Sequence, residues 1–266
     1  MKLSLAGWSL QKRFRSTDNP LKLLDFPAFS KEKFGIDAVE LNSPFFGSRS
    51  PKYLNELVAA AKKANVRLLN IAVDERGDLA SEDEAARKEG LAAYGAWIPI
   101  AKAISCSAIR CNSGGKTIKS RDAAVASCID SFRRLADDGR KHGITILMEN
   151  HGGISADADT IVQMMESLRQ SHGPDAVGTL PDFGNWPDNV DRYASLSKIM
   201  PYAKAVHAKV NDIDAQLNHP RFDHARCIRI ARESGYNGYL GIEYEGSGDP
   251  IEGVKRSVKK LTPLLA

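Results

Sequence analysis

Short runs of apolar and β-branched residues alternate along this chain with longer amphipathic segments. Short apolar runs separated by helical patterns are typical of βαβ units, in which the strands lie parallel. Eight such runs are predicted to be strands: residues 2–6, 38–41, 66–73, 108–111, 145–149, 177–182, 205–210 and 239–245.

The segments between these runs carry the usual signals for helix starts and stops. Pro51 stands at a first-turn position, where its missing N–H costs nothing, and Ser81 is a capping candidate before three acidic residues. Gly143 follows Lys141-His142 as a stop signal. Further helices are predicted over residues 119–142, 157–170, 189–200, 222–234 and 250–265.

Eight strands, each followed by a helix, predict a fold of the α/β class, a single (β/α)8 TIM barrel. The barrel is expected to span residues 1–266 as one domain. The rival is a doubly wound sheet, which usually carries a glycine-rich turn after its first strand. Here Ala6-Gly7-Trp8-Ser9 follows instead, without a GxGxxG motif.

Composition narrows the class of protein. The chain has 266 residues, of which 42% are apolar and 26% charged, and these values indicate a globular protein. Its net charge is only +4 and no long basic run is present, which argues against nucleic acid as a partner. The four cysteines form no CxxC pair, and no apolar run reaches membrane-spanning length. We therefore expect a cytoplasmic protein that has no membrane partner. The sequence does not decide whether it forms a homo-oligomer.

Charged residues stand where four consecutive predicted strands end, and the active site of a barrel lies at those ends. A carboxylate buried at a strand end costs several kcal/mol unless it is paired, and a divalent cation removes that cost. Three carboxylates with one imidazole suit Mn²⁺, Mg²⁺ or Co²⁺ better than Zn²⁺. The alternative is that each acid is only a strand-end ion-pair partner. The predicted metal ligands are Glu149, Asp182, His207 and Glu243.

Several motifs at these strand ends resemble those of the xylose isomerase-like barrel superfamily, also called the sugar phosphate isomerase/epimerase family. They are Val39-Glu40-Leu41, Met148-Glu149-Asn150, Pro181-Asp182-Phe183-Gly184-Asn185, Val206-His207-Ala208-Lys209 and Gly241-Ile242-Glu243-Tyr244-Glu245-Gly246. As an ordered set they are specific for the superfamily, and the likeness extends over essentially the whole chain. They do not specify a substrate.

This resemblance implies that the four residues bind one divalent metal ion, and that Glu149 and Glu243 are also the catalytic acid and base. It implies a sugar isomerase or epimerase that transfers protons through a metal-bound cis-enediolate, with a small-molecule sugar or sugar derivative as substrate. Loss of a β-substituent from the same enediolate would instead make the protein a lyase, such as a dehydratase or an eliminase of keto-sugar derivatives. A related abasic-site endonuclease and a non-catalytic binding protein are the remaining alternatives.

The chain departs from the ketose 3-epimerases of this family at two positions. Those enzymes have a histidine three residues after the aspartate that corresponds to Asp182, and this chain has Asn185 there. They also have an arginine shortly after the histidine that corresponds to His207, whereas the nearby residues here are Lys209, Asn211, Asp212 and Ile213, with Arg221 further on. Both differences argue against an epimerase that acts on a free ketose.

Further candidates follow from the strand alternation, which places residues i and i+2 on one face. Lys209 lies two residues after His207 and is predicted to bind substrate, with an ion pair to Glu245 as the alternative. His151 and Asn185 are also predicted to bind substrate, with an ordinary loop role as the alternative. For Glu40, bracing of the barrel mouth is preferred to substrate binding.

Overall fold

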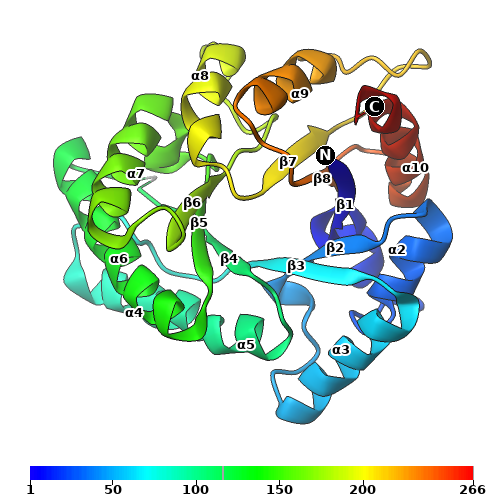
Figure 1. Cartoon of the computed structure of the whole chain (residues 1–266), viewed down its shortest axis with the longest axis horizontal. Helices are drawn as coiled ribbons and strands as arrows, with labels where there is room; N and C mark the ends of the chain where they lie inside the picture. The colour runs from blue at the N-terminus through cyan, green and yellow to red at the C-terminus, as the bar shows by residue number, and fades with distance from the viewer. Residues whose placement is uncertain (116, 266) are drawn as a thin grey trace.

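The computed structural model describes residues 1–115 and 117–265, and its strands form a barrel surrounded by helices (Figure 1). All ladders of the eight-stranded sheet are parallel, in the order β6-β5-β4-β3-β2-β1-β8-β7. The strands are β1 (Lys2–Ala6), β2 (Ala38–Asn42), β3 (Arg67–Ala72), β4 (Ala108–Cys111), β5 (Thr145–Glu149), β6 (Val177–Leu180), β7 (Val206–Val210) and β8 (Tyr239–Tyr244). The predicted TIM barrel is confirmed, and all eight predicted strands are present among the described residues.

The barrel closes between β6 and β7 without a regular ladder. Two isolated parallel bridges connect each strand with the segment next to the other, Thr179 of β6 with Ala203 before β7 and Asp182 after β6 with His207 of β7. We predicted that the sixth strand would extend to Asp182, but it ends at Leu180, because Pro181 has no N–H to donate to a ladder. The bridge nevertheless places Asp182 directly beside His207.

The helices form the outer ring of Figure 1. They are α1 (Gln11–Phe14), α2 (Phe26–Phe34), α3 (Pro51–Ala64), α4 (Glu84–Gly95), α5 (Ile98–Ala103), α6 (Arg121–His142), α7 (Ala158–His172), α8 (Arg192–Ile199), α9 (His224–Glu233) and α10 (Pro250–Leu261). Short 3-10 turns, η1 (Gly7–Leu10), η2 (Ser43–Phe45), η3 (Gly153–Ala156), η4 (Met200–Tyr202) and η5 (Thr262–Leu265), join or extend them. None of the helices in the described ranges is long and apolar enough to cross a membrane.

Local capping explains where these helices begin and end. The Ser50 hydroxyl accepts a hydrogen bond from the N–H of Tyr53 and so caps α3, with Pro51 in the first turn as predicted. The cap of α4 is Asp83 rather than the predicted Ser81, because the Asp83 carboxylate accepts from two backbone N–H groups of the first turn. Gly143 ends α6 with φ of 69°, in the left-handed region that glycine adopts without strain.

Burial of His224 at the start of α9 makes the stability of the fold depend on pH. The side chain is fully buried, its Nε2 lies 3.0 Å from the carbonyl oxygen of Lys209, and burial lowers its pKa to about 3. In the unfolded chain the imidazole takes up a proton near its ordinary pKa of 6.5. Acid therefore favours the unfolded state between these two values.

We predict that the free energy of unfolding falls by about 2 kcal/mol between neutral pH and about pH 5 because of this histidine alone. The loss should disappear in His224→Gln and persist in His142→Gln, a partly exposed histidine at the end of α6. Urea unfolding of the three proteins at both pH values measures the difference. An equal loss in His224→Gln and the unaltered protein would contradict the prediction.

Candidate metal centre and active site

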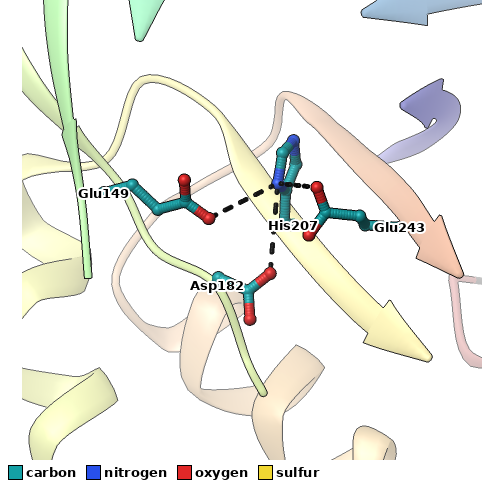
Figure 2. A group of neighbouring side chains, drawn as sticks. All are labelled: Glu149, Asp182, His207 and Glu243. Carbon is teal, nitrogen blue, oxygen red and sulfur yellow. Dashed lines mark ion pairs between the residues drawn. The ribbon is translucent and has the colours of Figure 1, made fainter. Parts of the chain in front are cut away.

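Four acidic and imidazole side chains converge at the carboxyl ends of four consecutive strands, as Figure 2 shows. One ligand atom from each lies within 4.8 Å of the others, and all four residues are buried. They are the residues predicted from the strand ends, Glu149 of β5, Asp182 after β6, His207 of β7 and Glu243 of β8.

Three oxygens surround Nδ1 of His207 in this group. The distances from that nitrogen are 3.9 Å to Glu149 Oε1, 4.0 Å to Asp182 Oδ2 and 3.7 Å to Glu243 Oε1. Neither Nδ1 nor Asp182 Oδ2 has a hydrogen-bond partner among the described residues, although both are buried. Buried polar atoms without partners are rare, so these atoms fit the donors of a cation.

The protonation of these groups also favours a cation. Burial, which outweighs the nearby Lys209, raises the pKa of Asp182 to about 7, and burial raises that of Glu149 against the pull of Arg110. Although burial opposes it, Glu243 and Glu40 raise the pKa of His207 to about 10. Asp182, Glu149 and His207 therefore hold their protons more tightly than isolated side chains do, and a divalent ion would take over the compensating charge of these protons.

Glu40 sets the orientation of the His207 ring through the nitrogen that faces away from the group, Nε2. Its Oε2 lies 3.0 Å from Nε2 of His207 and accepts a hydrogen bond of 2.8 Å from Asn70, and its Oε1 accepts one of 2.7 Å from Ser4. When a cation displaces the proton of Nδ1 and the proton on Nε2 stays beside Glu40, Nδ1 presents a lone pair to the centre of the group. Gly241 leaves room for this contact, since a Cβ there would come within 2.3 Å of Glu40 Oε1. The preferred interpretation of Glu40, that it braces the barrel mouth, agrees with these contacts.

Asp182 is held by its own loop and by the residue after Glu149. The backbone N–H of Asp182 donates to Asn150 Oδ1 at 2.7 Å, and the Asn150 amide donates to the Asp182 carbonyl at 2.9 Å. The side-chain Oδ1 of Asp182 accepts from the N–H groups of Gly184 and Asn185 at 2.6 and 2.9 Å. Only Oδ2 is thus left for the centre.

Arg110 is the main residue of this site that the sequence interpretation missed. It is buried in β4, and its Nε lies 3.0 Å from Glu149 Oε2 while an NH1 group lies 2.9 Å from Asp74 Oδ1. Its NH1 also donates to the side chain of Asn112 at 3.0 Å. The signal was available, because an arginine at the end of a buried strand needs a carboxylate partner.

The three residues predicted to bind substrate lie at different places. Asn185 donates to Glu149 Oε1 at 3.0 Å, so it touches a predicted ligand directly. Lys209 is buried, and its ammonium group contacts Glu243, lies 3.0 Å from Glu245 and lies 3.7 Å from Asp182. The ion pair with Glu245 that was the alternative for Lys209 is therefore present. The side chain of His151 is exposed beyond the end of β5.

Two aromatic residues, Trp8 and Phe45, pack together beside Glu245 at the barrel mouth. The Trp8 indole N–H donates to Glu245 Oε1 at 2.6 Å, and its ring stacks on Phe45 with centroids 6.0 Å apart. This chain of contacts runs from Trp8 through Glu245 and Lys209 to Glu243. The mouth is consequently tied together across β1, β7 and β8.

Comparison with known proteins identifies a family of TIM barrels whose model matches most of this chain. Residues 31–264 match the family model described as xylose isomerase-like TIM barrel. A 65-residue segment is 43% identical to the C-glycoside deglycosidase alpha subunit of Arthrobacter globiformis, but it covers only 22% of this chain and 18% of that protein.

Solved structures resemble the whole chain at low sequence identity. A D-tagatose 3-epimerase-like protein has a TM-score of 0.77 at 14% identity, covering 100% of this chain and 98% of its own. The 3-keto-D-glucoside 4-epimerase of E. coli has a TM-score of 0.75 at 17% identity, with 99% and 98% coverage. A xylose isomerase-like TIM barrel protein of Mycobacterium smegmatis in complex with magnesium has a TM-score of 0.70 at 19% identity, with 100% and 98% coverage. At such identities the likeness establishes the fold.

We predict that Glu40→Gln weakens the binding of Mn²⁺ by about 10- to 100-fold, because the residues that orient a metal-ligating histidine contribute this much to affinity. Isothermal titration calorimetry of the metal-stripped protein measures the effect. The matched control is Glu75→Gln, since Glu75 is also a carboxylate near the mouth but pairs with Arg49 and Trp97. Unchanged Mn²⁺ affinity in Glu40→Gln would show that Glu40 does not act through His207.

Proposed function

Because this chain belongs to the xylose isomerase-like TIM barrel family, we propose that it is a divalent-metal-dependent isomerase or epimerase that acts on a sugar or sugar derivative. The observation that carries the proposal is the buried group of three carboxylates and one imidazole at the mouth of the barrel. Such a group is costly to bury without a cation, and catalytic residues of TIM barrels come from these strand ends.

The structural relatives support the proposed reaction class without deciding it. Two of them are a D-tagatose 3-epimerase-like protein and a 3-keto-D-glucoside 4-epimerase, and a third is a barrel in complex with magnesium. Proteins of these kinds fit a site in which a cation and acidic side chains act on a sugar. The group contains a single histidine, His207, whereas an abasic-site endonuclease of this family would need several more as metal ligands.

In this proposal Glu149, Asp182, His207 and Glu243 hold one cation, for which Mn²⁺, Mg²⁺ or Co²⁺ fits the oxygen-rich donor set better than Zn²⁺. The cation would act as a Lewis acid that stabilises negative charge on the sugar oxygens. Glu149 and Glu243 carry protons to and from the carbon next to the sugar carbonyl. They come from β5 and β8 and approach the centre from different sides, which suits removal and return of a proton on different faces (Figure 2).

The remaining predicted residues bind the substrate in this proposal. Asn185 and Lys209 already contact the two proposed proton carriers, Glu149 and Glu243, so a sugar held near these glutamates lies within their reach. His151 is exposed and free to approach a sugar hydroxyl from the solvent side. Asn185, an amide where ketose 3-epimerases have a histidine, argues for a substrate other than a free ketose.

A lyase on the same scaffold is the second candidate. It would lose a β-substituent after the same proton removal, and it needs no different metal site. The segment that matches a subunit named C-glycoside deglycosidase favours it, although the match covers less than a fifth of that protein. Proton NMR of the products separates the candidates, since rearrangement of the sugar supports the first and release of water or an aglycone supports the second.

We predict that Glu149→Gln and Glu243→Gln each lower kcat by at least about 100-fold, because a glutamine amide cannot carry a proton. A panel of sugars and keto-sugar derivatives in D₂O, with Mn²⁺ restored, gives turnover and exchange of the substrate proton by NMR. Metal content is measured on the same samples, since both residues are also proposed ligands. Glu75→Gln serves as the control and should keep its activity.

Full activity in either variant would overturn the proton-transfer mechanism. A variant that retains its metal but loses exchange of the substrate proton would separate the acid–base role from the ligand role. If the metal-stripped protein binds no divalent ion and is active without one, the metal-dependent function itself is wrong.

A further inference from the structure

Every carboxylate of the candidate metal group turns one oxygen inward and has the other held from outside. The inward atoms are the three that surround His207 Nδ1 at 3.7 to 4.0 Å. The outward oxygen of Asp182 is held by backbone N–H groups. The outward oxygens of Glu149 and Glu243 are instead held by side-chain cations, Arg110 and Lys209.

These two cations come from different strands, Arg110 from β4 and Lys209 from β7, and are themselves fixed. Arg110 is anchored by Asp74 at 2.9 Å and by the carbonyl of Val73 at 3.3 Å. Lys209 is anchored by Glu245 at 3.0 Å, and Trp8 in turn holds Glu245. Both side chains are buried, so neither can leave its glutamate for water without first breaking these contacts.

The backbone is shaped to let Lys209 reach this place. A Cβ on Gly184 would lie 2.4 Å from Cγ and 2.6 Å from Cβ of Lys209, so only glycine leaves space for the lysine stem beside Asp182. The approach of Lys209 to Glu243 is therefore built into the loop that follows β6. Simple neutralisation of the acids does not require a cation on the outward oxygen of each glutamate.

We propose that Arg110 and Lys209 are positioning residues that hold the outward oxygens of Glu149 and Glu243, so that each glutamate gives a cation one oxygen rather than two. This rests on the metal site of the proposed function. With one atom each from Asp182 and His207, the protein then supplies four donors. Mg²⁺ and similar ions prefer six, so positions stay open for a substrate, as a catalytic site requires.

The test is the sign of the change in metal affinity. Removing either cation frees a second carboxylate oxygen and removes a positive charge that repels the metal. Arg110→Gln and Lys209→Gln should therefore bind Mn²⁺ at least about tenfold more tightly than the unaltered protein in calorimetry. A residue that only supports the fold would change affinity in the opposite direction when it is replaced.

A spectroscopic readout reports the coordination itself. The absorption of bound Co²⁺ and the electron paramagnetic resonance spectrum of bound Mn²⁺ should change in both glutamine variants. Arg110→Lys and Lys209→Arg, which keep a cation beside each glutamate, should restore affinity and spectra toward those of the unaltered protein. Lys12→Gln is the matched control for charge, because Lys12 binds the backbone carbonyls of residues 246–248 and touches none of the four ligands.

Weaker or unchanged Mn²⁺ binding with unchanged spectra in the glutamine variants would overturn the inference, as would an equal gain in affinity in Lys12→Gln. If Arg110→Gln does not fold, Lys209→Gln decides alone by the same criteria. Failure of the proposed function gives a different result, because the unaltered protein itself then binds no Mn²⁺. In that case the positioning role is wrong as well.

Discussion

Concentrated negative charge in a buried place is the constraint on which this site depends. Glu149, Asp182 and Glu243 lie at the ends of neighbouring strands, out of water, and their inward oxygens face one imidazole nitrogen. Carboxylates in such surroundings either take up protons or gather positive charge. Burial raises the pKa of Asp182, and the carboxylates of Glu243 and Glu40 raise the pKa of His207 although burial opposes this.

The layer of residues around this group gives each ligand a defined orientation. Glu40 fixes the ring of His207, Asn150 fixes the backbone at Asp182, and Arg110 and Lys209 hold the two glutamates. Because these partners are buried and bonded on further sides, the inward atoms are held in place before any ligand arrives. Preorganisation of this kind is what allows an electrostatic site to act without reorganising during a reaction.

The same surrounding residues affect two glutamates that are proposed to serve both acid–base chemistry and metal binding. Glu149 and Glu243 are proposed both to bind a cation and to carry protons, and each has one oxygen beside a protein cation. Although burial opposes it, Lys209 with His207 lowers the pKa of Glu243 to about 2, whereas burial raises the pKa of Glu149 despite Arg110. Two glutamates with pKa values moved apart suit different roles in proton transfer.

The sequence by itself determined the barrel and the four converging residues, because strand alternation and the rule that strand ends share one mouth need only local patterns. Asp182 was placed among them because the predicted sixth strand, residues 177–182, ended on it, although β6 itself ends at Leu180. Only the tertiary structure decided what surrounds them. Arg110 and Asn150 are ordinary strand-end residues in the sequence, and their partners Glu149 and Asp182 lie 39 and 32 positions away. Such pairings depend on register, and the contacts of Lys209 and Glu40 depend also on the room left by Gly184 and Gly241, which no local pattern encodes.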